Sequence, residues 1–163
     1  CRDVLALRES FEHLRAGGGV LSGALNFPGD LASEYGGLYF YGGHSVEMLT
    51  AVFGPDVRSV RTDVHKGNLI ALAKYDDFTV TMNFSNVPQY YGTIYSPDGV
   101  VFRQLDTSLI YRDGFAKFAG ALRTGKTPES FESLLQPVRI LNALQESVEN
   151  GGAETTVQAV GAF

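Results

Sequence analysis

Residues 78–84 read Phe-Thr-Val-Thr-Met-Asn-Phe, and this stretch decides the fold. Apolar and polar side chains alternate strictly along it, which predicts a β-strand because successive strand side chains point to opposite faces. One face is apolar, and the other carries Thr79, Thr81 and Asn83. Such alternation is typical of an antiparallel sheet with one covered face and one open face.

Further strands flank this segment, and turn residues separate them. Strands are predicted over residues 57–64 and 69–75 before it, and over 90–95 and 100–105 after it. Pro97 and Gly99 hold the second and fourth positions of a four-residue turn, as a type I turn prefers. Consecutive strands with short turns predict a β-meander of five strands.

Segments with helical spacing lie on both sides of this meander. Helices are predicted over residues 3–15, 44–53, 115–125 and 127–151, with two more strands over 20–27 and 155–160. The residues between them at 31–43 are rich in Gly and Tyr and are expected to form a loop. Thr127 is the expected N-cap of the last helix. Pro137 is expected to kink that helix or mark its start.

The predicted fold class is therefore α+β, a single domain over residues 1–163. It has about six strands in a predominantly antiparallel sheet, with helices packed on one face. The open face has two interpretations, a solvated surface or an interface. Tyr90, Tyr91 and Tyr95 fall in the strand that follows residues 78–84, and tyrosine on an open sheet suits an interface.

The composition excludes several classes of protein. The chain is 44% hydrophobic and 19% charged, as ordinary globular proteins are. A net charge of −5 without a Lys/Arg cluster argues against nucleic-acid binding. No apolar run approaches the roughly 20 residues of a membrane helix. One cysteine and three scattered histidines argue against a metal site. These features predict a cytoplasmic protein.

The chain begins at Cys1 rather than Met, which predicts a piece of a longer protein. A lipid-anchored mature terminus is the alternative. The common signatures for phosphate binding, dinucleotide binding and serine hydrolysis are absent from these residues.

His44 is the candidate residue for proton transfer. It follows Gly42 and Gly43 at the expected start of a helix, where the positive helix end would lower its pKa and favour the neutral, proton-accepting form. Glu47, one turn later, can reach the ring. The alternative is that His44 caps the helix and Glu47 supports its first turn. Asn26, at the end of a predicted strand, is either a turn residue or a group that binds substrate hydroxyls.

The order of these features resembles the C-terminal domain of the Gfo/Idh/MocA oxidoreductases, the group of glucose–fructose oxidoreductase and inositol dehydrogenase. The first block of the resemblance is Tyr-Gly-Gly-His-Ser-Val-Glu-Met-Leu at 41–49, similar to the family's G-x-H-x-x-D helix, and then Phe53-Gly54. The second block is the meander, with turns at 75–77 and 97–99. The third comprises the closing helices, which include Ile-Leu-Asn-Ala-Leu-Gln-Glu-Ser at 140–147.

The resemblance implies a function for the whole protein. In that family an N-terminal Rossmann domain binds NAD or NADP, while the C-terminal domain supplies the substrate wall, a histidine and an oligomer interface. His44 is then the catalytic acid/base, and Asn26, Tyr39, Tyr41 and Glu47 line a pocket for a sugar, a polyol or a related hydroxy compound.

Other expectations concern the parent chain. The Rossmann half is missing from these residues, so no dinucleotide is expected to bind to them and the isolated chain is expected to be inactive. A homodimer or tetramer is expected to form through the sheet face.

Two positions depart from the family pattern. Phe40 stands four residues before His44, where many members have an aspartate, and Glu47 stands where aspartate is common. These departures leave a second interpretation open, a non-catalytic dimerising or ligand-sensing module of the same fold.

Overall fold

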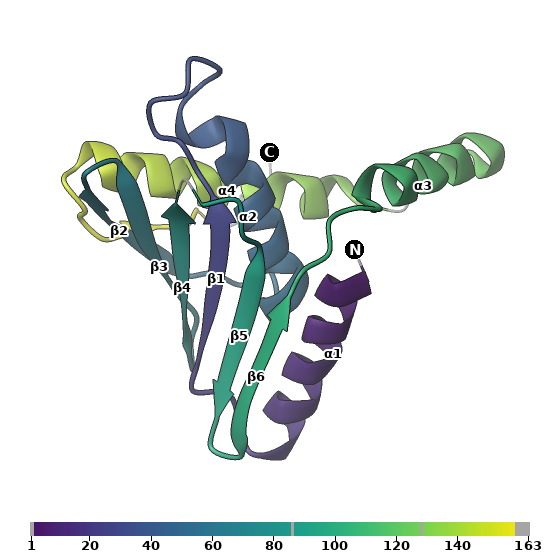
Figure 1. Ribbon diagram of the computed structural model, residues 1–163, viewed down its shortest axis with the longest axis horizontal. Coiled ribbons are helices and arrows are strands. Elements are labelled where there is room, and N and C mark those ends of the chain that lie inside the picture. The colour runs from purple at the N-terminus through teal and green to yellow at the C-terminus, as the bar shows by residue number, and fades with distance from the viewer. Residues whose placement is uncertain (1, 86, 128, 159–163) are drawn as a thin grey trace.

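A computed structural model describes residues 2–85, 87–127 and 129–158 (Figure 1). The helices are α1 (Arg2–Gly17), α2 (Leu38–Phe53), α3 (Ile110–Thr124) and α4 (Phe131–Glu149). The strands are β1 (Ser22–Pro28), β2 (Ser59–His65), β3 (Asn68–Lys74), β4 (Thr79–Ser85), β5 (Tyr91–Ser96), β6 (Gly99–Gln104) and β7 (Thr155–Thr156). The α+β class predicted from the sequence is confirmed.

The described strands form one open sheet of seven, in the order β6-β5-β1-β4-β3-β2-β7. Every pairing is antiparallel except that of β1 with β4, which is parallel. The predicted five-strand meander is wrong at one point, because β1 lies between β4 and β5. Leu25, Asn26 and Phe27 are buried in succession, so β1 is a central strand that requires partners on both edges.

The predicted alternation of β4 is confirmed. Val80, Met82 and Phe84 are buried, and they lie beneath α1, α2 and α4, which cover one face of the sheet (Figure 1). No helix of the described residues lies on the other face, which carries Thr79 and Thr81. At the β2–β3 hairpin Lys66 and Gly67 both have positive φ, the geometry of the two-residue turn that matches the strand twist.

The helix α2 begins at Leu38, six residues earlier than predicted, and part of the expected loop at 31–43 is therefore helical. The loop was predicted because this segment is rich in glycine. Gly42 is buried inside α2, where an added Cβ would lie 3.1 Å from Leu141 of α4 and 2.9 Å from Leu38. Gly42 thus permits close packing of two helices rather than a loop conformation.

In the last third of the chain, the helices and the strand begin or end at other residues than predicted. α3 starts at Ile110 rather than at 115, and α4 is capped by Ser130, whose hydroxyl accepts a hydrogen bond from Ser133 N, instead of by Thr127. Pro137 lies inside α4 rather than at its start. Strand β7 covers only two of the expected residues 155–160, and residues 159 and 160 lie outside the described part.

Candidate active site

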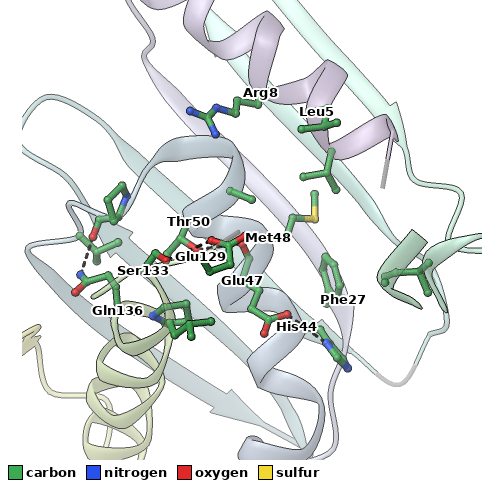
Figure 2. A pocket seen from close by; sticks show the side chains of 18 of the residues that line it. Leu5, Arg8, Phe27, His44, Glu47, Met48, Thr50, Glu129, Ser133 and Gln136 are labelled. Atoms are coloured by element: carbon green, nitrogen blue, oxygen red, sulfur yellow. Dashed lines mark hydrogen bonds and ion pairs between the residues drawn. The ribbon is translucent and has the colours of Figure 1, made fainter. Parts of the chain in front are cut away.

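His44 lies on the exposed side of α2 and pairs with Glu47 one turn later. The imidazole Nδ1 is 3.6 Å from Glu47 Oε2, and the two side chains are 64% and 68% exposed. Figure 2 shows them directed toward one another. The predicted reach of Glu47 to the ring is confirmed.

The predicted effect on the histidine is wrong. Because α2 begins at Leu38, His44 lies in its second turn instead of at its positive end. The Glu47 carboxylate, by hydrogen bonding and charge, raises the pKa of His44, while partial burial acts in the opposite direction. The charged imidazolium of His44 is therefore favoured relative to a histidine that has no carboxylate beside it.

A large hollow of about 2010 Å³ opens beside this pair. His44, Glu47 and Tyr41 line it from α2, together with Met48 and with Phe27 at the end of β1 (Figure 2). Other walls come from the first turns of α1, from α3 and from the start of α4. The hollow is open to solvent and larger than the roughly 300–1,000 Å³ of a typical small-molecule site, and it places a titratable pair beside an extensive apolar lining.

Tyr39 and Tyr41 lie at the start of α2 and face different surroundings. The Tyr39 hydroxyl donates to Asn142 Oδ1 at 3.1 Å, which ties α2 to α4. The ring of Tyr41 lies edge-on to Phe40, with centroids 4.7 Å apart, and Phe40 in turn packs on Tyr35 at 5.1 Å. Of the two predicted pocket tyrosines, the hollow includes Tyr41 and not Tyr39.

Asn26 is not brought together with His44. Its side chain is 3% exposed, its Nδ2 donates to Gln89 O at 2.6 Å, and its Oδ1 accepts from Asn83 Nδ2 at 2.8 Å. The register pairs Asn26 with Asn83 and Tyr91, which places its side chain on the open face of the sheet, opposite α2. In this position its amide joins neighbouring strands.

Sequence reasoning missed part of the hollow wall. Arg8 of α1 lines it and forms an ion pair with Glu12 at 2.8 Å. Phe115 and Phe118 of α3 also line it and are exposed. Spacing identifies which residues share a face, but it does not say what the face touches.

The described residues lack the sequence and topology of a Rossmann dinucleotide site. The turn after β1 lacks the G-x-G-x-x-G pattern that lets the backbone approach a pyrophosphate. In a Rossmann unit a helix connects two strands of one parallel sheet, whereas α2 connects β1 to β2 and these two strands are not neighbours in the sheet. Nor do the described residues bring three or more His, Cys, Asp or Glu side chains together as a metal would require. Within the same residues, every helix is too short or too polar to cross a bilayer.

No protein-family model and no curated protein matches the chain. Solved structures match it in fold. GenD2 from gentamicin A biosynthesis, in complex with NAD, superposes with a TM-score of 0.78 at 15% identity over 96% of this chain. Myo-inositol dehydrogenase from Lactobacillus casei, in complex with NAD(H) and myo-inositol, has a TM-score of 0.75 at 11% identity over 100% of it.

The WlbA dehydrogenase from Bordetella pertussis, in complex with NADH and UDP-GlcNAcA, has a TM-score of 0.71 at 16% identity over 96% of this chain. The chain spans only 61% of GenD2 and of the inositol dehydrogenase, and 62% of WlbA. In fold, the predicted resemblance to part of a Gfo/Idh/MocA-type dehydrogenase is confirmed.

Proposed function

We propose that residues 1–163 form the C-terminal substrate-binding and oligomerisation domain of an NAD(P)-dependent oxidoreductase of the Gfo/Idh/MocA family. Its substrate is a sugar, a polyol or a related hydroxy compound. The observation that carries the proposal is the His44–Glu47 pair at the edge of the hollow, in a fold shared with dehydrogenases. GenD2, the inositol dehydrogenase and the WlbA dehydrogenase were each crystallised with NAD, NAD(H) or NADH.

In this function His44 moves the proton of the substrate hydroxyl. With Nδ1 turned toward the Glu47 carboxylate, the ring keeps its N–H on that side and leaves Nε2 to exchange a proton with a hydroxyl. The Glu47 carboxylate raises the pKa of His44 and so favours its proton-donating form, and a histidine can serve as acid in one direction of the reaction and as base in the other. Tyr41 forms the wall next to His44.

The dinucleotide belongs to the remaining part of the parent chain. The described residues do not fit its pyrophosphate, so this domain contributes only the substrate wall and the proton exchange. Isolated from that part, the chain is expected to be inactive. The cytoplasmic location stays a prediction.

The open sheet face is the proposed oligomer interface. Tyr95, Val100, Phe102 and Ile70 are exposed on or next to it, and aromatic and aliphatic side chains of this kind are enriched where protein surfaces meet. The register of strands β6, β5 and β3 places them on the face that none of the described helices covers. A homodimer or tetramer through this face would leave the hollow of His44 accessible on the other side.

The test uses the parent protein with a panel of sugars and polyols. His44→Ala is expected to lower turnover about 100-fold or more, because general acid–base groups contribute factors of this size. His65→Ala is the matched control, since His65 is an exposed histidine at the end of β2. Near-normal turnover of the His44 variant would remove this residue from the mechanism.

A non-catalytic ligand-sensing module is the second candidate, and Phe40 favours it. An aromatic side chain packed between Tyr35 and Tyr41 occupies the position where the family often has an aspartate. Saturable sugar binding that needs no dinucleotide, together with absent turnover in the parent protein, would support this candidate over the enzyme.

A further inference from the structure

Three aromatic side chains form an exposed cluster where the connection from β1 enters α2. The ring centroids of Tyr35 and Phe40 lie 5.1 Å apart, and those of Phe40 and Tyr41 lie 4.7 Å apart. Tyr35 is 68% exposed, Phe40 45% and Tyr41 42%. We call these three side chains the aromatic platform. Rings that contact one another and remain accessible offer an apolar surface to a ligand.

The turn before α2 holds Tyr35 against Phe40. Ser33 O accepts hydrogen bonds from Gly36 N at 3.3 Å and from Gly37 N at 2.8 Å. Both glycines have positive φ, which residues with a Cβ rarely adopt, so the chain reverses here and enters α2. Figure 1 shows this connection projecting beyond the end of the sheet. Backbone hydrogen bonds thus position the aromatic platform before a ligand arrives.

The aromatic platform lies beside the candidate catalytic histidine. Phe40 and His44 are four residues apart in α2, so they share one face of the helix and lie about 6 Å apart along its axis. Phe40 contacts Tyr41, which lines the hollow together with His44. A substrate whose hydroxyl meets His44 can therefore extend one helical turn toward the start of α2 and lie against Phe40.

The chemistry of this segment indicates what lies against the aromatic platform. The Phe40 side chain has no polar group for a sugar hydroxyl, whereas its ring can stack on another ring. Asp30 and Glu34 are the only charged residues at 29–37, and both are acidic, so this segment offers no cation to a phosphate. The hollow of about 2010 Å³ has room for more than one ring of a substrate. These features favour an uncharged aromatic group.

We propose that the aromatic platform is a subsite for an uncharged aromatic ring attached to the sugar or polyol that reacts at His44, an inference that rests on the proposed function. The substrate class is then an aryl glycoside or a similar aromatic conjugate rather than a free sugar. Phe40 packs against the attached ring, while His44 exchanges the proton of a hydroxyl on the sugar. A nucleotide sugar fits less well, because its phosphates would approach Asp30 and Glu34.

Calorimetric titration of the full-length parent protein with matched phenyl and methyl glycosides tests this subsite. The pairs are made from glucose, galactose and mannose, so that the two members of a pair differ only in the attached group. We expect the phenyl glycosides to bind about tenfold more tightly, because contacts between aromatic rings contribute effects of this size. Phe40→Leu should reduce this preference to about twofold or less, since it keeps an apolar side chain and removes the ring, and Phe40→Tyr should retain it. Phe131→Ala is the matched control, because Phe131 is an exposed ring outside the residues that line the hollow.

Equal affinity for the phenyl and methyl glycosides of all three sugars, or no binding of any phenyl glycoside, would overturn the subsite. So would a preference that survives in Phe40→Leu or disappears in Phe131→Ala. Tighter binding of UDP-glucose than of phenyl glucoside would overturn the uncharged character of the ligand.

Turnover with NAD(H), measured on the same parent protein, keeps the two proposals separate. A preference for phenyl glycosides that depends on Phe40, in a protein without turnover, would contradict the enzymatic function and keep the subsite. Turnover in a protein that binds phenyl and methyl glycosides equally would contradict the subsite alone.

Discussion

Ser147 near the end of α4 provides a quantitative test of how this domain is held together. Its hydroxyl is fully buried and accepts hydrogen bonds from Thr62 N and Thr62 Oγ1, both at 3.0 Å, while it donates to Ala153 O at 2.7 Å. The edge strand β7 pairs with β2 only at Ser59 and Val60. Ser147 therefore satisfies the backbone donor of Thr62 beyond the end of β7.

Ser147→Ala leaves these groups without their partner. Ala153 is exposed, so water can replace the lost donor at its carbonyl, whereas Thr62 is buried and its N–H remains unsatisfied. A buried donor that is left without a hydrogen-bond partner lowers the free energy of unfolding by about 1–3 kcal/mol. We expect a loss of about 2 kcal/mol in the free energy of unfolding, which lowers the Tm of a domain of this size by about 4–8 °C.

Urea unfolding of the chain, followed by circular dichroism, measures this loss. Glu146→Ala is the control in the same helix, because Glu146 is exposed and such surface changes stay within about 0.5 kcal/mol. A Ser147→Ala protein with the stability of the Glu146→Ala control would refute the assignment of Ser147 as the buried partner of Thr62.

Two further predictions concern the site and the core. Glu47→Gln should lower the pKa of His44 toward its ordinary value of 6.5, because the carboxylate is the main cause that raises it; an unchanged NMR titration of the His44 ring would contradict this. The stabilisation from the pair is present below pH 6.5 and is lost as pH rises through the raised pKa, so Glu47→Gln should lower stability mainly on the acid side. Gly23→Ala should cost about 1–3 kcal/mol, because the new Cβ would lie 2.6 Å from Cε1 of the buried Phe53 ring. Gly43→Ala, with no atom within 4 Å of its Cβ, should be neutral or stabilising in the same urea assay, and equal stability of the two variants would refute the packing argument.

The sequence predicted well those features that depend on local periodicity. Alternation at 78–84 identified β4 and its buried face, and the helical spacing identified four helices with boundaries that differ by up to six residues. It also predicted that Glu47 reaches His44, because a separation of three residues brings side chains together on any helix.

Only the tertiary structure decided which faces meet. Asn26 lies at the end of a strand, as predicted, yet the insertion of β1 between β4 and β5 turns its amide toward Asn83, away from the hollow. Gly42 was expected in a loop, but it lies inside α2, where Leu141 of the distant helix α4 packs against it. Tyr111, Phe115 and Phe118 of α3 recur with the spacing of a core helix, but none of the residues of α3 is buried in the described fold. Periodicity determines which side chains share a face, whereas their partners depend on contacts between segments far apart in the sequence.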